Sequence, residues 1–302
     1  MSDASETAAA RSRRSFLGAS NTAPAAARGV AAAIAEAAAA QSPSRTAGRK
    51  PQGLTDADIF NFALNLEYLE TEYYMRGLTG QGMNPAMAGP APGPVRGGGR
   101  VQFQNPMFRQ FLENIARNEN GHVNFLRRTL GTAAISRPKI DFEAGFAAVA
   151  RAAGRGSGFD PFADETSFLL GGYLFEDVGI TVYKGAAPWI RNRDYLKAAA
   201  GIHAAEGYHM GVVRSVLYRK GPQARDWARR ISDLRDSLDG PVELDQPLEL
   251  GGMANIVPSD SGGVTFSRTP AEVLNIVYGQ SGAGITSGGF FPDGLAGRVR
   301  ST

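Results

Sequence analysis

The chain has 302 residues, of which 43% are hydrophobic; it contains three histidines and no cysteine. The lack of cysteine excludes disulfides, thiolate-held metals and cysteine nucleophiles, so a metal site would have to use His, Asp and Glu. Residues 1–50 carry seven Lys/Arg and three Asp/Glu, a net charge of +4. Because the whole chain has a net charge of +3, residues 51–302 sum to −1 and are nearly neutral. This balance gives no indication of nucleic-acid binding, and the chain lacks an apolar run long enough for a membrane span.

The N-terminal segment resembles a twin-arginine export signal. The motif reads Ser12, Arg13, Arg14, Ser15, Phe16, Leu17 and Gly18, with only the glycine departing from the usual pattern. An Ala-rich stretch follows, with small residues near 38–40 that suit cleavage. We therefore expect export to the periplasm or secretion, and we assign residues 1–50 to this segment. The alternative is a disordered basic tail, because Arg28 and Glu36 interrupt the apolar region.

Residues 54–240 divide into helical segments with clear start signals. Thr55 caps the first helix, with Asp58 completing a capping box, and this helix should end near Gly77. The Gly/Pro-rich segment 80–100 is long for a compact domain, which indicates a functional or mobile loop. The second helix is predicted to begin after Asn105, with proline at its first position, and to end at Gly131.

The later helices are predicted from the same kinds of start and stop signals. Residues 132–159 form a long connection with a short helix around 142–153. The next helices are predicted over 160–184, starting at Asp160-Pro161, and over 194–219. A highly charged helix over 223–238 should face solvent. Residues 241–302, with one short helix from Pro270 to Tyr278, are interpreted as a strap packed on the bundle.

Two Glu-x-x-His motifs carry the chemistry. Glu119 and His122 lie on the second predicted helix, and Glu206 and His209 lie on the fourth. Residues three apart project from one helix face, so each pair is able to bind the same ion or neighbouring ions. Two such motifs are unlikely to arise by chance in a chain with only three histidines.

The other two helices supply one inward glutamate each. Glu67 is followed by Tyr74, and Glu176 is followed by Tyr183 at the same separation of seven residues. Two helical turns place each tyrosine on the face of its glutamate. The two halves of the chain therefore repeat one pattern, which favours Glu67 over the nearby Glu70 and Glu72.

This arrangement is typical of di-iron carboxylate bundles, in which two helices give one Glu each and two give Glu-x-x-His. The predicted ligands are Glu67, Glu119, His122, Glu176, Glu206 and His209. Four carboxylates would offset two divalent ions, iron or manganese. Tyr74 and Tyr183 would hydrogen-bond the ligands or carry electrons, and Asp177 would orient a ligand histidine. Glu70 remains an alternative ligand, and His203 is left unassigned. The competing interpretation is a bundle with an empty, vestigial site.

Three segments show a family resemblance. Residues 61–70 (NFALNLEYLE), 268–279 (RTPAEVLNIVYG) and 289–295 (GFFPDGL) resemble the ferritin-like family that includes the plant desiccation-related proteins. The resemblance covers about residues 54–297. It implies an all-α, ferritin-like four-helix bundle with a long crossover, two bound metal ions and export in many members.

The resemblance does not fix a reaction, so two hypotheses stand. In the first, the centre reacts with dioxygen or peroxide, as a di-iron oxidase or a manganese catalase-like scavenger. In the second, the protein sequesters metal or protects other components during drying, without turnover. The expected partners are metal ions and small oxygen species, with a homo-oligomer left open and neither nucleic acid nor membrane. A storage cage is disfavoured because segment 80–100 and the strap would have to fit around cage contacts.

Overall fold

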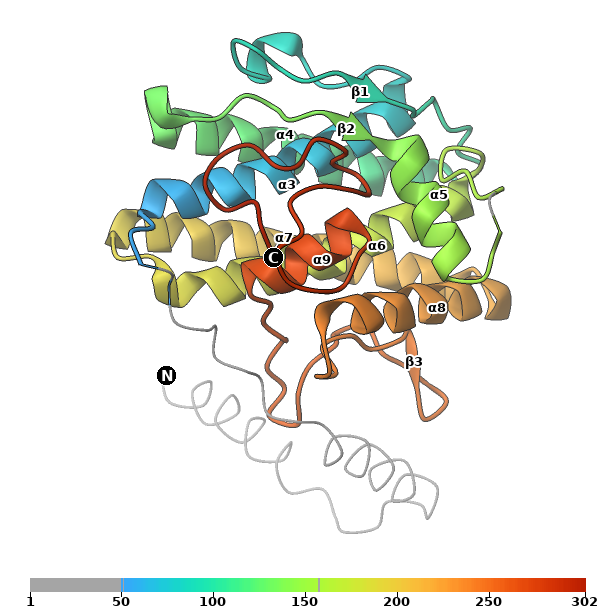
Figure 1. Ribbon diagram of the computed structural model, residues 1–302. Helices are drawn as coiled ribbons and strands as arrows, with labels where there is room; N and C mark the ends of the chain where they lie inside the picture. Colours follow the sequence, from blue (N-terminus) through green and yellow to red (C-terminus); the bar gives the residue numbers. More distant parts are fainter. Residues whose placement is uncertain (1–49, 51, 157) are drawn as a thin grey trace, which may run out of the picture. The chain divides into compact units, whose positions relative to one another are not determined.

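The computed structural model describes residues 50, 52–156 and 158–302, so the predicted export signal lies outside the described residues. Four long helices form a bundle: α3 (Asp56–Thr79), α4 (Pro106–Leu130), α6 (Glu165–Ala186) and α7 (Arg193–Arg219). The closest pairings are α3 with α4 and α6 with α7, and α3 also packs on α6 (Figure 1). The predicted all-α four-helix bundle is confirmed. No helix in the described part is long and apolar enough to cross a membrane.

Helix capping explains where the long helices begin. The Thr55 side chain accepts a hydrogen bond from the Asp58 backbone N–H, and the Asp58 side chain accepts one from the Thr55 N–H, as predicted. The predicted start of the third helix at Asp160-Pro161 is wrong. Asp160 instead forms a turn, in which its carboxylate accepts from the Phe162 N–H, and α6 begins after Asp164. Asp164 is the better cap because its carboxylate accepts the Ser167 N–H at 2.8 Å.

Shorter elements surround the bundle. The helices are α5 (Phe142–Ala152), α8 (Pro222–Asp239) and α9 (Pro270–Tyr278), and the 3-10 turns are η1 (Pro85–Met87), η2 (Gly131–Ala133) and η3 (Ala187–Trp189). Two small sheets pair β1 (Val95–Arg96) with β2 (Ile140–Asp141) in parallel, and β3 (Glu249–Leu250) with β4 (Met253–Ala254) antiparallel.

The prediction that residues 223–238 face solvent is wrong for one side of α8. Ala224, Ala228, Ile231 and Arg235 recur at helical spacing and are buried. The helix packs this stripe on α6, α7 and α9. The buried stripe could not be recognised in the sequence, because the helix is rich in charged residues and one residue of the stripe, Arg235, is itself charged and fully buried.

The segment 80–100 is tied to the rest of the chain. Its β1 pairs with β2, and the Gly93 N–H donates to the Arg137 carbonyl at 2.8 Å. Arg137 donates back to the Gly93 carbonyl and forms an ion pair with Glu72 of α3. The segment thus forms a hydrogen-bonded cover along α3 and the connection before α5.

The C-terminal segment is also anchored on α3. The Asn65 side chain donates to the Ala296 carbonyl at 2.9 Å and accepts from the Ala296 N–H at 3.0 Å. Figure 1 shows this segment passing in front of α3, and α9 packs on α6 and α8. As a result α3 and α6 are buried along most of their length, which places Glu67 and Glu176 inside the molecule.

A buried ionic network joins α6, α7, α8 and the segment before α9. One oxygen of Asp177 accepts from Arg214 at 2.6 Å and from Arg235 at 2.8 Å. The network continues through three more buried residues: Asp239, Asp245 and Arg268. The prediction that Asp177 orients a ligand histidine is therefore wrong, because two guanidinium groups hold the one carboxylate oxygen that is hydrogen-bonded.

Candidate metal centre

The bundle interior brings together the six residues that the sequence singles out. They form two overlapping groups, in each of which the potential ligand atoms lie within 4.8 Å of one another. One group is Glu67, Glu119, His122 and Glu206, and the other is Glu119, Glu176, Glu206 and His209. Glu119 and Glu206 belong to both groups, so the geometry is that of two adjacent sites with two shared carboxylates.

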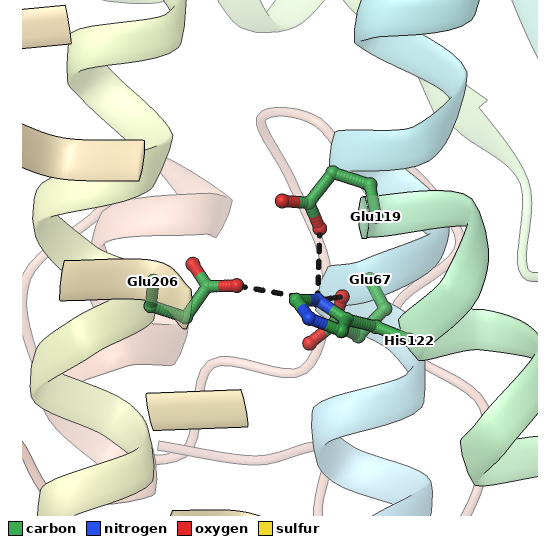
Figure 2. Close-up of side chains that lie close together, drawn as sticks. All are labelled: Glu67, Glu119, His122 and Glu206. Carbon is green, nitrogen blue, oxygen red and sulfur yellow. Dashed lines mark hydrogen bonds and ion pairs between the residues drawn. The ribbon is translucent and has the colours of Figure 1, made fainter. Parts of the chain in front are cut away.

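The first site is centred on the ring of His122. Its Nδ1 lies 3.2 Å from Glu67 Oε2, 3.4 Å from Glu206 Oε1 and 3.5 Å from Glu119 Oε2. Figure 2 shows the three carboxylates converging on this nitrogen from different helices. Three of the four residues belong to the α3–α4 hairpin, and Glu206 comes across from α7.

The second site repeats the first on the α6–α7 hairpin. His209 Nδ1 lies 2.7 Å from Glu119 Oε1, 3.6 Å from Glu176 Oε2 and 3.9 Å from Glu206 Oε1. Glu119 therefore turns one oxygen toward each histidine, the arrangement expected of a bridging ligand.

Burial and unmet hydrogen bonding show that this donor set fits metal ions. Glu67, Glu119, Glu176 and Glu206 are all 0% exposed. Both oxygens of Glu119 and of Glu206, one oxygen of Glu176 and Nδ1 of His209 have no hydrogen-bond partner. Buried carboxylates without partners are very costly, and two divalent cations would satisfy these atoms at once.

The pKa values of these groups reflect the crowding of negative charge. Burial raises the pKa of Glu67 to about 7, although His122 opposes the shift. Burial and the neighbouring carboxylates raise the pKa of Glu206 well above its usual range. Burial alone would also raise the pKa of Glu119, but His209 and His122 outweigh it and lower that pKa.

The pKa values of the two histidines are raised by the same carboxylates, which favours the charged form of each imidazole. Burial lowers the pKa of an imidazole, but Glu67 and Glu119 raise that of His122 to about 11. Glu176 and Glu119 likewise raise the pKa of His209 to about 10. Without metal, protons on the imidazoles thus offset part of the carboxylate charge.

The two tyrosines bond across the repeat. Tyr74 of α3 donates to Glu176 Oε1 of α6 at 2.5 Å, and Tyr183 of α6 donates to Glu67 Oε1 of α3 at 2.5 Å. Each tyrosine therefore contacts the glutamate of the other half, although its spacing alone places it near its own. The hydrogen bonds are present, and an electron-carrying role stays a prediction.

Glu70 and Gly179 break the symmetry of the repeat. Each lies three residues after its half's glutamate, Glu67 or Glu176. Glu70 is buried, belongs to neither ligand group, and has its pKa raised well above the usual range by burial and by nearby carboxylates. A Cβ at Gly179 would lie 2.5 Å from Glu206 Oε2 and 3.4 Å from Glu70 Oε1, so the glycine leaves room for both carboxylates.

The residue that contacts a ligand histidine from outside is Asn118, which the sequence reasoning missed. His209 Nε2 lies 3.2 Å from Asn118 Oδ1, so this nitrogen donates its proton and leaves Nδ1 facing the carboxylates. The available signal was its place beside Glu119 on a helix that faces α7. His203 is turned away, with Nδ1 lying 3.0 Å from the Ile180 carbonyl oxygen.

Asn118→Leu should weaken metal binding by about 10- to 100-fold, because His209 loses the acceptor that fixes its tautomer and ring orientation. Metal titration of the purified protein would measure the change. Asn114→Leu is the matched control, since Asn114 lies one turn away and hydrogen-bonds Asn118 without touching the histidine. Equal affinities for the two variants would contradict the orienting role.

Comparison with known proteins agrees with this geometry. The model of the ferritin-like domain family matches residues 55–219, a span that contains all six candidate ligands. The chain therefore belongs to the ferritin-like domain family.

Two curated relatives cover most of the chain. "Ferritin-like catalase Nec2" of Nesocodon mauritianus is 29% identical over 269 residues, covering 81% of this chain and 84% of the relative. "Desiccation-related protein PCC13-62" of Craterostigma plantagineum is 28% identical over 243 residues, covering 73% and 76%. No solved structure matches.

Proposed function

We propose that this chain is a stress-related di-metal carboxylate protein that binds two iron or manganese ions and decomposes hydrogen peroxide. The observation that carries the proposal is the pair of overlapping donor groups, in which both oxygens of Glu119 and of Glu206 and one oxygen of Glu176 are buried without a hydrogen-bond partner. The relative named a ferritin-like catalase supports peroxide as the substrate, and the one named a desiccation-related protein supports a role in stress. Export through the twin-arginine pathway belongs to the same proposal and rests on the sequence of residues 12–18 and of the Ala-rich stretch that follows.

The geometry supports one assignment of ligand roles. Glu67 and His122 would hold one ion, and Glu176 and His209 the other, with Glu119 and Glu206 shared. Such a pair of redox-active ions supplies the two electrons that are exchanged when two peroxide molecules become water and dioxygen.

The surrounding residues prepare the centre for this chemistry. The tyrosine hydroxyls occupy Oε1 of Glu67 and of Glu176, which leaves Oε2 of each glutamate facing the histidines. Burial and the neighbouring carboxylates raise the pKa of Glu70 well above its usual range, which favours the protonated form of this carboxyl group beside the centre. The packing of α3 and α6 keeps bulk water away from Glu67 and Glu176.

Oxygen release from peroxide tests the proposal. The protein loaded with manganese or with iron should release oxygen, measured with an oxygen electrode, and Glu206→Gln should abolish the release. Glu113→Gln is the control, because Glu113 is about half exposed and pairs with Arg109 at the surface. Full metal occupancy without oxygen release would instead support metal sequestration without turnover.

Metal binding should release protons and weaken as pH falls. His122 and His209, with pKa values of about 11 and about 10, are protonated at neutral pH in the metal-free protein. Each ion must displace such a proton, and the raised pKa values of Glu67 and Glu206 add protons to be displaced, so at least two protons should leave per pair of ions. Titration calorimetry in two buffers of different ionisation enthalpy measures the number, and an absence of proton release would contradict the assignment.

The raised pKa values of His122 and His209 also determine how the stability of the metal-free protein changes with pH. A histidine pKa raised by folding stabilises the fold fully below the unfolded value of about 6.5. That contribution is lost as pH rises through the folded values of about 10 and about 11. Protein freed of metal by a chelator should therefore lose this stabilisation at alkaline pH.

A further inference from the structure

A groove opens beside the metal centre, between α4 and α7. It has a volume of about 340 Å³ and receives side chains from both helices, among them Phe111, Ile115, Asn118, Tyr208 and His209. The two helices pack less closely on each other than either packs within its own hairpin, which leaves space for the groove. Phe111 and Tyr208 are exposed, at 39% and 77%.

The inner end of the groove is formed by the imidazole ring of His209, and the candidate carboxylate ligands lie on the other side of this ring. His209 lines it, and this histidine has Nε2 at Asn118 and Nδ1 at Glu119. A molecule in the groove would therefore lie next to the outer edge of a ligand histidine, close to the centre and still open to solvent.

The lining indicates an uncharged, partly aromatic occupant. Among the described residues that form the groove there is no Asp, Glu, Lys or Arg, and the charge of a protonated His209 is offset by Glu119, 2.7 Å from its Nδ1. Phe111 and Tyr208 offer aromatic surface, which favours ring stacking or edge contacts. Arg117 approaches only from the exposed rim, where it donates to Asn114.

Asn118 supplies a polar anchor at the inner end. Its Oδ1 lies within hydrogen-bond distance of two donors, Asn114 Nδ2 at 3.3 Å and His209 Nε2 at 3.2 Å. With that oxygen occupied, the amide NH2 of Asn118 is the group left to donate to an oxygen of a bound molecule.

The volume exceeds what peroxide or dioxygen needs. A water molecule occupies about 30 Å³ of liquid, and a cavity of about 150 Å³ holds benzene. The groove is more than twice the latter volume, so it accommodates a single aromatic ring with its substituents.

We propose that the groove is a binding site for a small uncharged phenol. The ring lies between Phe111 and Tyr208, and the hydroxyl group accepts a hydrogen bond from Asn118. The site deepens the proposed function, since it places an organic molecule beside the centre that is proposed to bind metal. The binding itself does not require the metal.

Ligand-observed NMR with phenol as the probe tests the site. Saturation transfer from the full-length, metal-free protein to phenol should be seen, and Phe111→Ala and Tyr208→Ala should each weaken binding by about 2- to 10-fold. Leu196→Ala is the control, because Leu196 is exposed on α7 but does not line the groove. Both groove side chains are exposed enough for the variants to fold.

Manganese loading separates the two proposals. Manganese-loaded protein should shorten the proton relaxation times of phenol, zinc-loaded protein should not, and the groove variants should remove the effect. Phenol binding with uptake of neither manganese nor iron would overturn the proposed function alone. Normal manganese uptake with no phenol binding, or with binding unchanged in both variants, would overturn the groove site. A dimer in light scattering that Tyr208→Ala dissociates, with no phenol binding, would show that a second copy covers the groove.

Discussion

Glu119→Gln should cost the protein both metal ions, whereas Glu67→Gln should cost only one. Glu119 presents Oε2 to His122 and Oε1 to His209, so its loss removes a ligand from both sites. Glu67 lies in the first group alone. Elemental analysis should fall from about two ions per chain to near zero for Glu119→Gln, and to about one for Glu67→Gln.

Glu113→Gln, on the same helix and half exposed, should retain the full metal content. Equal loss of one ion in the Glu119 and Glu67 variants would show that Glu119 does not bridge. Less than about a tenth of an ion in the parent protein after loading with either metal would leave a bundle with a vestigial site.

Asp177→Ala should destabilise the fold by about 3–5 kcal/mol, the usual cost of removing one partner from a buried ion pair. Asp177 holds both Arg214 and Arg235, whose side chains are fully buried, so the variant leaves two guanidinium groups short of a counter-charge. Denaturant unfolding of the metal-free protein measures the change without a contribution from bound ions.

Asp226→Ala provides the comparison, because Asp226 forms ion pairs with Arg229 and Arg230 at the surface of α8. Its removal should leave the denaturant midpoint almost unchanged. An Asp177 variant as stable as the Asp226 variant would mean that the network around Asp245 and Arg268 compensates. An Asp177 variant of full stability with altered metal affinity would restore the histidine-orienting role.

The six candidate ligands could be expected to lie together because their signal is local and repeated. Glu-x-x-His needs only the periodicity of one helix, and the seven-residue step from Glu67 to Tyr74 recurs from Glu176 to Tyr183. The helix starts at Thr55 and Asn105 were predictable for the same reason, since a cap acts within three residues. The start of α6 was predicted wrongly at Asp160-Pro161, because an aspartate before a proline also forms the turn that is seen there.

The remaining features depend on pairings across the fold. Asn118 meets His209 and Asp177 meets Arg214 only because α4 and α6 each lie beside α7, and no local pattern carries that information. The burial of Arg235 could not be predicted for the same reason, because a charged residue in a highly charged helix is expected to face solvent unless its partners, here Asp177 and Asp245, are known.

The crossed tyrosine bonds bear on how such a centre came to exist in one chain. Each hairpin carries a glutamate, a tyrosine and a Glu-x-x-His, yet its own glutamate is held by the tyrosine of the other hairpin. A lone hairpin would therefore have lacked one of the two shared carboxylates and the tyrosine that hydrogen-bonds its own glutamate. An ancestral hairpin could have formed the complete centre only as a pair of copies, in which the bonds that now join two halves joined two subunits.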